Sequence, residues 1–296
     1  SDVYKRQLRN SPAYLQSSRK DMFAMIRQLG VPTWFMSLSA ADLHWKPLLI
    51  TLGKQIDNKD YTEQVNNETL NWETKTRLVR TDPTLCARYF NHRVEQFINT
   101  VIKSPHNPIG KIVDFAYRVE FQHRGSPHIH MLMWAKDAPT LENNTTEEII
   151  EFVDKYVSCS LDVDEEIKKY IKLQIHKHSR TCRKLRKALC RFGYPLPPFP
   201  NTVILEPFKD DTEDKFYEKL YSKIKETLDE MKEGSDISFD EFLNQLKCTY
   251  SDYELAIRSS LTSTKIFLKR KLSEIRVKTY MKNLVEAWKA NHYNKY

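Results

Sequence analysis

The stretch Val119-Glu-Phe-Gln-His-Arg-Gly-Ser-Pro-His-Ile-His130 reads as the end of one strand, a turn and the start of the next strand. Gly125 suits the positive φ that a tight turn requires. In an extended strand His128 and His130 share one face, with their Cα atoms about 6.6–7 Å apart. The stretch therefore predicts two imidazoles side by side on the surface of a sheet.

Two imidazoles so placed can bind one divalent metal ion if a neighbouring strand supplies a further ligand. Glu120 and Gln122 share a face of the preceding strand, so the hairpin brings them alongside the histidines. A His-x-His triplet alone is more often a pair of hydrogen-bonded strand histidines, but this lead-in favours a metal site. We assign catalytic and metal-binding roles to His128, His130, Gln122 and Glu120. Nitrogen and oxygen donors with room for substrate oxygens fit Mg²⁺ or Mn²⁺ in phosphate chemistry better than structural zinc.

A second group of metal-ligand residues follows the hairpin in the chain. His178, Cys182 and Cys190 have a spacing that permits a tetrahedral zinc site, and Cys159 is the candidate fourth ligand. The spacing matches no standard zinc finger, and His176 can replace His178 as a ligand. The alternative interpretation is a basic helix with incidental cysteines.

Charge is distributed unevenly along the 296 residues, whose net charge is +8. Residues 168–191 contain ten basic residues and no acidic one, and residues 265–296 contain nine basic residues against two acidic ones. Separate basic blocks indicate a polyanionic partner, most often nucleic acid, although solvated helix faces give similar runs. The candidate DNA-binding residues are Arg124, Lys172, Lys177, Arg180, Arg183, Lys184, Arg186, Lys187 and Arg191.

Periodicity predicts an α+β protein with a central antiparallel sheet flanked by helices. The predicted strands cover residues 33–39, 112–122 and 127–134. The segment 58–73 reads as a loop, and residues 201–296 read as helical, with one helix over residues 277–291. The helix over residues 12–29 has an apolar face that we expect in the core. The longest apolar runs are too short for a membrane span, and the five cysteines favour reduced thiols over a disulfide framework.

Several motifs resemble the Helitron helicase-like domain. They are Pro32-Thr-Trp-Phe-Met-Ser-Leu-Ser-Ala-Ala-Asp-Leu-His-Trp45, the His-x-His segment Glu120–His130, the Cys/His segment Gln174–Cys182 with Cys190–Pro195, and Arg276–Tyr280 with Ala287–Asn291. Their order and spacing are similar to the family over nearly the whole chain.

The resemblance implies a Rep-type (HUH) endonuclease of a rolling-circle transposon, normally followed by a helicase domain in the same chain. It implies nicking of single-stranded DNA by a tyrosine, metal assistance and a nuclear location. The family's paired tyrosines lie beyond the Ala-Trp-x-Ala-Asn segment, so we expect the nucleophile beyond Tyr296, in a longer intracellular chain. Tyr293 and Tyr296 are candidates only by position.

The expected organisation has four parts, and two other functions compete with nicking. The parts are a helical lead-in at 1–30, an HUH-type nuclease core at 31–158, the Cys/His basic segment with a Pro-rich linker at 159–200, and a helical region at 201–296. The competing functions are a non-catalytic, zinc-containing nucleic-acid-binding domain and a metal-dependent phosphoesterase.

Overall fold

The computed structural model describes residues 11–121, 125–179, 182–183, 190–208, 215–232, 235, 237–288 and 292–295. The chain forms two compact units, one of residues 1–138 with 290–296 and one of residues 139–289. The expected boundary after residue 158 therefore falls inside the second unit, and the last residues of the expected helical region return to the first. Among the described residues, no helix is long and apolar enough to cross a membrane.

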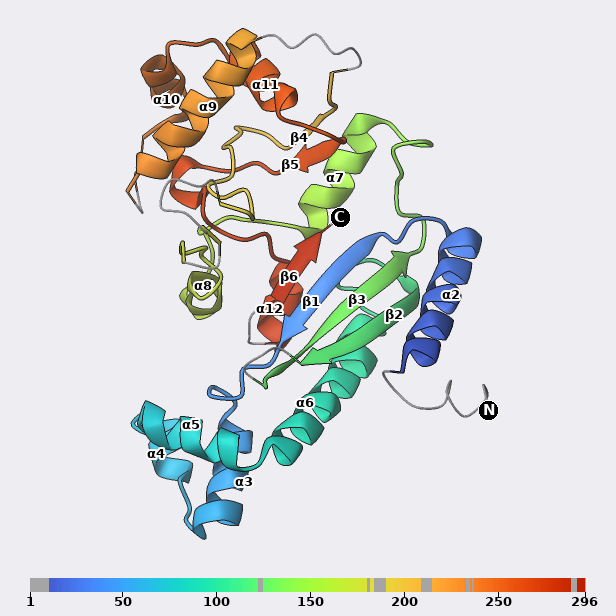
Figure 1. The fold of residues 1–296 in the computed structure, drawn as a ribbon, viewed down its shortest axis with the longest axis vertical. Helices are drawn as coiled ribbons and strands as arrows, with labels where there is room; N and C mark the ends of the chain where they lie inside the picture. The colour runs from blue at the N-terminus through green and yellow to red at the C-terminus, as the bar shows by residue number, and fades with distance from the viewer. Residues whose placement is uncertain are drawn as a thin grey trace. The chain divides into compact units, whose positions relative to one another are not determined.

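The first unit contains a four-stranded antiparallel sheet in the order β2-β3-β1-β6 (Figure 1). Its strands are β1 Trp34–Ser39, β2 Ile112–Phe121, β3 Pro127–Ala135 and β6 His292–Lys295. Its helices are α2 Pro12–Leu29, α3 Lys46–Asp57, α4 Thr62–Asn66, α5 Trp72–Thr81, α6 Pro83–Phe97 and the π-helical turn η1 Ile98–Ile102. The three strands predicted from alternating and apolar sequence are confirmed.

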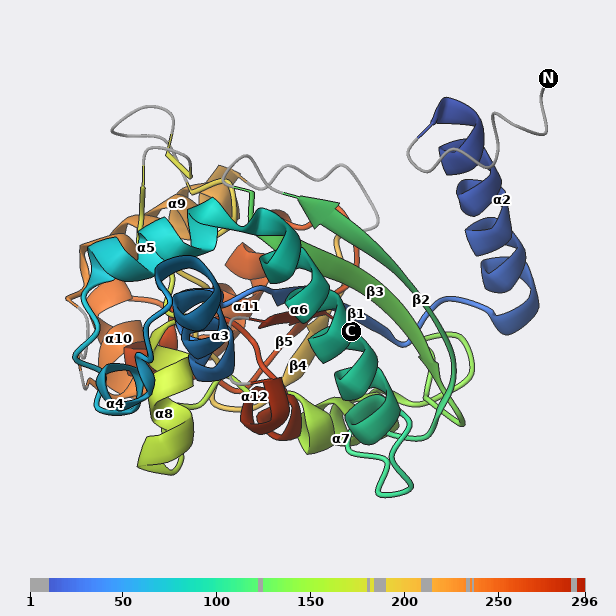
Figure 2. The same cartoon turned by 90° about the horizontal axis from the view of Figure 1, so that it is seen from below.

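One face of this sheet forms the core of the first unit. Side chains at alternate positions of β1 and β3 are fully buried, namely Trp34, Met36, Leu38, Ile129, Met131 and Met133. Helix α6 lies along this sheet and contributes its apolar stripe of Cys86, Phe90, Val94 and Phe97 (Figures 1 and 2). The alternation leaves the other face of β3 for His128 and His130, as the sequence predicts.

Two expectations for the first unit are wrong. The apolar face of α2 is not core, because the helix stands away from the sheet and none of its residues is buried (Figure 2). The segment predicted as a loop over residues 58–73 contains α4 and the start of α5. Asn71 caps α5 by accepting from the backbone of Thr74, a signal hidden in a polar stretch.

The second unit is mainly helical. Its helices are α7 Thr146–Tyr156, α8 Glu165–Lys172, α9 Lys215–Glu230, α10 Phe239–Leu246, α11 Tyr250–Ser259, the 3₁₀ turn η2 Leu272–Glu274 and α12 Lys282–Trp288. The predicted capping box at Ser238 is confirmed, since its side chain and that of Glu241 satisfy each other's backbone amides. Buried side chains of α9, α10 and α11 form an apolar cluster around Phe242 and Tyr253.

Two departures from helix occur in the second unit. Strands β4 Val203–Leu205 and β5 Lys265–Phe267 pair antiparallel, within a region predicted as helical. Within the described part of the helix predicted over residues 277–291, the helical residues are those of α12. Tyr280 and Val277 instead form isolated bridges with Ser158 and Ile175, so these residues are extended.

Candidate functional site

The hairpin site consists of Glu120 on β2 and His128 and His130 on β3. Glu120 lies directly opposite His128 in the antiparallel register, so the three side chains share one face of the sheet. The two Nε2 atoms are 3.0 Å apart, and Glu120 Oε2 is 3.6 Å from Nε2 of His128 and 3.4 Å from Nε2 of His130. Three donor atoms therefore converge on one point.

This geometry fits a divalent metal ion. With metal–ligand bonds of about 2.1 Å, nitrogens 3.0 Å apart subtend about 90° at the ion, the angle between neighbouring octahedral ligands. Burial, followed by the charge of His130, lowers the pKa of His128, so that ring is neutral at pH 7 and able to coordinate. The donors thus fit the metal predicted from sequence, while their chemistry leaves its identity open.

The surroundings of the hairpin site hold the ligands and leave access to them. Phe35 on β1 stacks on the His130 ring, with centroids 5.6 Å apart and planes inclined by 18°. Glu120 is exposed and His130 partly exposed, whereas His128 is buried. Nδ1 of each histidine is buried without a hydrogen-bond partner in the described part of the chain. The rings are therefore positioned by packing, with an exposed side from which a substrate can approach.

Register reveals further residues on this face that the motif reading missed. Arg118 on β2 lies opposite His130 and is exposed, and Ser37 and Ser39 on β1 lie opposite His130 and His128. The backbone of Tyr293 on β6 is in turn opposite Ser37. Period-two alternation back from Glu120 would have identified Arg118. The other two predicted hairpin residues, Gln122 and Arg124, lie outside the described residues.

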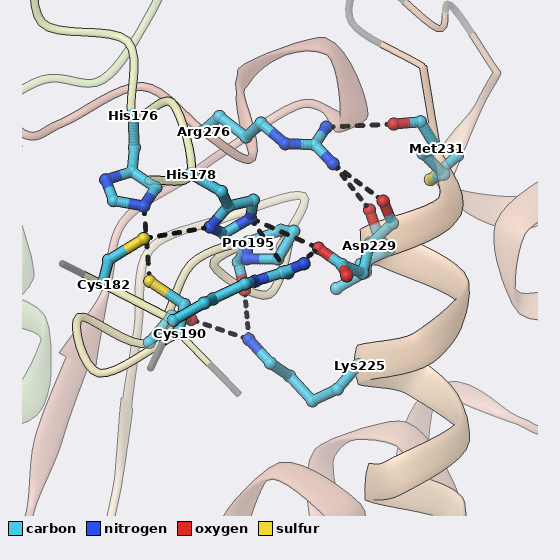
Figure 3. A network of polar contacts seen from close by, with 12 residues as sticks. His176, His178, Cys182, Cys190, Pro195, Lys225, Asp229, Met231 and Arg276 are labelled. Carbon is cyan, nitrogen blue, oxygen red and sulfur yellow. Dashed lines mark hydrogen bonds and ion pairs between the residues drawn. The ribbon is translucent and has the colours of Figure 1, made fainter. Parts of the chain in front are cut away.

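The Cys/His cluster consists of His176, His178, Cys182 and Cys190. Its ligand atoms all lie within 4.8 Å of one another. Cys190 Sγ is 3.3 Å from His176 Nε2, and Cys182 Sγ is 3.6 Å from His178 Nδ1. A tetrahedral zinc ion separates sulfur and nitrogen ligands by about 3.5 Å, calculated from its usual bond lengths. Figure 3 shows the four side chains pointing toward one another.

The structure does not bring Cys159 to this cluster. Cys159 is buried with Ile167 and Tyr280, and its thiol donates to the carbonyl of Lys269. His176 is instead the fourth potential ligand. His176 and His178, which the sequence offered as alternatives, therefore both belong to the cluster. Since the sequence gives distance along the chain alone, it could not separate a nearby cysteine from one on another surface.

Local contacts in the Cys/His cluster favour the protonation states that a bound metal ion requires. The backbone N–H of Ser179 donates to Cys182 Sγ over 3.1 Å and lowers the pKa of that thiol, which favours the thiolate. Burial, followed by the charge of neighbouring His178, lowers the pKa of His176 to about 4. The imidazole is therefore neutral at pH 7, as coordination requires.

The basic residues around the cluster differ in availability. Lys172, Lys177 and Arg191 are exposed, whereas Arg183 donates to Asp229 over 2.5 Å. The remaining candidates, Arg180, Lys184, Arg186 and Lys187, lie outside the described residues.

Aromatic residues divide into buried and exposed ones. Trp34, Trp134, Tyr280 and Trp288 are buried core residues, so Tyr280 and Trp288 of the basic C-terminal block are not surfaces for base stacking. Phe192 is 51% exposed, and the Arg191 guanidinium lies 4.6 Å from its ring centroid. Its exposure makes Phe192 the aromatic side chain beside the cluster that a base could reach.

Comparison with known families agrees with the motif resemblance over the first unit. Residues 1–133 match the family described as Helitron helicase-like domain at N-terminus. The matched residues include β1, β2, His128 and His130, whereas the Cys/His cluster lies beyond them. No curated protein matches the chain.

Proposed function

We propose that the first unit is the metal-dependent, HUH-type single-stranded DNA endonuclease domain of a Helitron-like transposase. The observation that carries this proposal is the convergence of His128, His130 and Glu120 on one accessible point of the sheet. The Helitron family match over the same residues supports a nucleic-acid substrate and a larger parent chain with a helicase domain. We infer a nuclear location from the same family context.

The side chains of the hairpin site would have separate roles in metal binding and DNA binding. His128 and His130 would hold the ion through Nε2, and Glu120 would supply a carboxylate oxygen on the side open to solvent. A bound Mg²⁺ or Mn²⁺ would polarise the scissile phosphate. Arg118, exposed on the same face, is placed to bind a neighbouring phosphate of the DNA strand.

Nicking also requires a tyrosine hydroxyl to attack the phosphate. We expect this nucleophile beyond Tyr296, as the family arrangement implies. Within the chain, the backbone of Tyr293 is in register with His130 through Ser37, two strands away in the sheet. If the 296-residue chain becomes covalently attached to single-stranded DNA, Tyr293→Phe tests whether that residue forms the bond.

The decisive experiment measures Mn²⁺ affinity and Mn²⁺-dependent binding of labelled single-stranded DNA. The double variant His128→Ala with His130→Ala should lose at least about 100-fold in Mn²⁺ affinity, since two of three ligands are gone. A matched control removes two exposed histidines elsewhere in the first unit, His92 and His106, and should bind like the wild type. Unchanged Mn²⁺ affinity in the His128/His130 variant would show that the site assignment is wrong.

A second function is favoured by the surroundings of the Cys/His cluster. The cluster lies beside exposed Phe192 and Arg191 and near Lys172 and Lys177, a combination that binds single-stranded nucleic acid by stacking and charge. A non-catalytic zinc module would bind DNA with a steep salt dependence and would ignore the hairpin substitutions. Phe192→Ala should weaken this binding severalfold, whereas Phe216→Ala, which removes an exposed phenylalanine on α9, should not.

A phosphoesterase would behave differently from both. It would hydrolyse a generic phosphodiester such as bis(p-nitrophenyl) phosphate without DNA, and His128→Ala with His130→Ala would abolish the turnover. Absence of turnover together with Mn²⁺-dependent DNA binding favours the endonuclease domain.

A further inference from the structure

Helix α9 presents a polar face to the Cys/His cluster (Figure 3). Lys225 and Asp229 are four residues apart on this helix and therefore share a face. Lys225 Nζ donates to the carbonyl oxygens of Gly193 and Pro195, just after the ligand Cys190. Asp229 lies one turn further on, beside His178. The helix therefore contacts both the segment that follows the last ligand and a ligand itself.

The end of α9 is connected to the first ligand as well. Arg276 donates to the carbonyl oxygens of Asp229 and Met231, each over 3.0 Å. The carbonyl of Arg276 in turn accepts from the backbone N–H of His176 over 2.7 Å. These contacts fix the C-terminal end of α9 relative to the cluster, so Asp229 is held in place from both sides.

His178 approaches the cluster through Nδ1, which lies 3.6 Å from Cys182 Sγ. Its other nitrogen, Nε2, is 3.3 Å from Asp229 Oδ1. A neutral imidazole that coordinates through Nδ1 must carry its proton on Nε2, and that proton needs an acceptor. Asp229 provides it.

Arg183 competes for the same position. Its guanidinium is 3.1 Å from His178 Nε2 and 2.5 Å from Asp229 Oδ1. An arginine only donates, so pairing Arg183 with Nε2 would place the imidazole proton on Nδ1 and block coordination. Asp229 Oδ1 lies within reach of both donors, at 2.5 Å from the Arg183 guanidinium and 3.3 Å from His178 Nε2. A carboxylate oxygen can accept from both, which keeps Arg183 from acting on the ring.

We propose that Asp229 is a positioning residue of the Cys/His cluster: it holds His178 in the tautomer that presents Nδ1 to a metal ion and keeps Arg183 from imposing the other one. This inference rests on the proposed metal at His176, His178, Cys182 and Cys190. It adds that the metal site extends into α9, outside the segment that carries the ligands.

The test is Zn²⁺ affinity, measured on the 296-residue chain under reducing conditions by competition with a chromogenic chelator. Asp229→Asn keeps the size of the side chain and removes its charge, and should lower Zn²⁺ affinity about 10- to 100-fold. Glu226→Gln removes the same charge from an exposed position of α9 and should leave the affinity unchanged. Adding Arg183→Met to Asp229→Asn should recover part of the loss, since the competing donor is gone.

A second readout separates positioning from simple support of the fold. Asp229→Asn should lower the thermal midpoint in saturating Zn²⁺ and leave it unchanged in excess chelator. Equal losses in both conditions, or Zn²⁺ affinity within twofold of wild type, would overturn the role of Asp229. A wild-type chain that fails to bind Zn²⁺ would instead overturn the metal site itself.

Discussion

The hairpin site and the Cys/His cluster each gather nitrogen-containing ligands, but they differ in donor type and closure. The hairpin site offers two imidazoles and one carboxylate, two of them reachable from solvent. The Cys/His cluster offers two thiols and two imidazoles, three of them buried, with α9 behind them. An open site with oxygen donors fits an ion that meets substrate, whereas a closed four-ligand set fits an ion that supports the fold.

The largest expected effect comes from removing ligands of the closed cluster. Cys182→Ser with Cys190→Ser should abolish tight Zn²⁺ binding and reduce the free energy of unfolding in zinc by about 5 kcal/mol or more, because structural zinc contributes directly to folding. Thermal unfolding with and without chelator measures this loss. Cys248→Ser, outside the cluster, should keep zinc-dependent stability; a double variant as stable as the wild type in zinc would contradict a structural role.

The hairpin site should show the reverse pattern: losing a ligand should change metal affinity strongly and stability only slightly. His130→Ala should lower Mn²⁺ affinity about 100-fold while changing the free energy of unfolding by less than about 1 kcal/mol, because the side chain is partly exposed. Manganese titration and chemical denaturation measure the two quantities, with His92→Ala as the control. A large stability loss with unchanged Mn²⁺ affinity would reverse the assignment.

Cys86, which lies outside both clusters, shows how a buried environment changes the pKa of a thiol. Burial, followed by the charges of Asp42 and Asp82, raises the pKa of Cys86 to about 12, in contrast to the lowered pKa of Cys182. A raised native pKa stabilises the fold below the unfolded value near 9, and this contribution is lost as pH rises toward 12.

Chemical denaturation at two pH values tests this difference. The stability advantage of the wild type over Cys86→Ala should shrink by about 1.4 kcal/mol between pH 8 and pH 10. A pH-independent difference would show that the native thiol titrates like the unfolded one.

The smallest effect concerns Arg118. Arg118→Ala should weaken Mn²⁺-dependent binding of single-stranded DNA about threefold and lower its salt dependence by about one phosphate contact. Lys111→Ala, which removes an exposed cation just before β2, serves as the matched control. Fluorescence anisotropy at several salt concentrations gives both quantities, and equal effects of the two substitutions would remove Arg118 from the site.

Local pattern was sufficient where neighbouring residues decide the structure. The alternation around His128 and His130 predicted both strands and the face they share, and the Ser238 capping box predicted α10. Glu120 was placed correctly because a hairpin links it to His128 over a short distance.

The sequence pattern did not predict the features that depend on residues far apart in the chain. Three-residue strands such as β4 and β5 are too short for an alternation of polar and apolar residues to be recognised. The two strands pair with each other, although some sixty residues separate them in the chain. Tyr280 is extended because Ser158 pairs with it, which no local signal shows. Likewise, the exclusion of Cys159 and the contribution of Asp229 depend on how the second unit folds.

The position of β6 has a consequence for how the first unit assembles. Strand β1 ends at Ser39, and its partner β6 begins at His292, with the whole second unit between them in the chain. Closing so long a loop carries an entropic cost, so the β1–β6 pair belongs to the slow, high-contact-order part of folding. During synthesis the edge of β1 that pairs with β6 stays open until the second unit has been made. A circular permutant that links the two ends of the chain would bring β6 closer to β1 in the sequence and shorten the loop that must close.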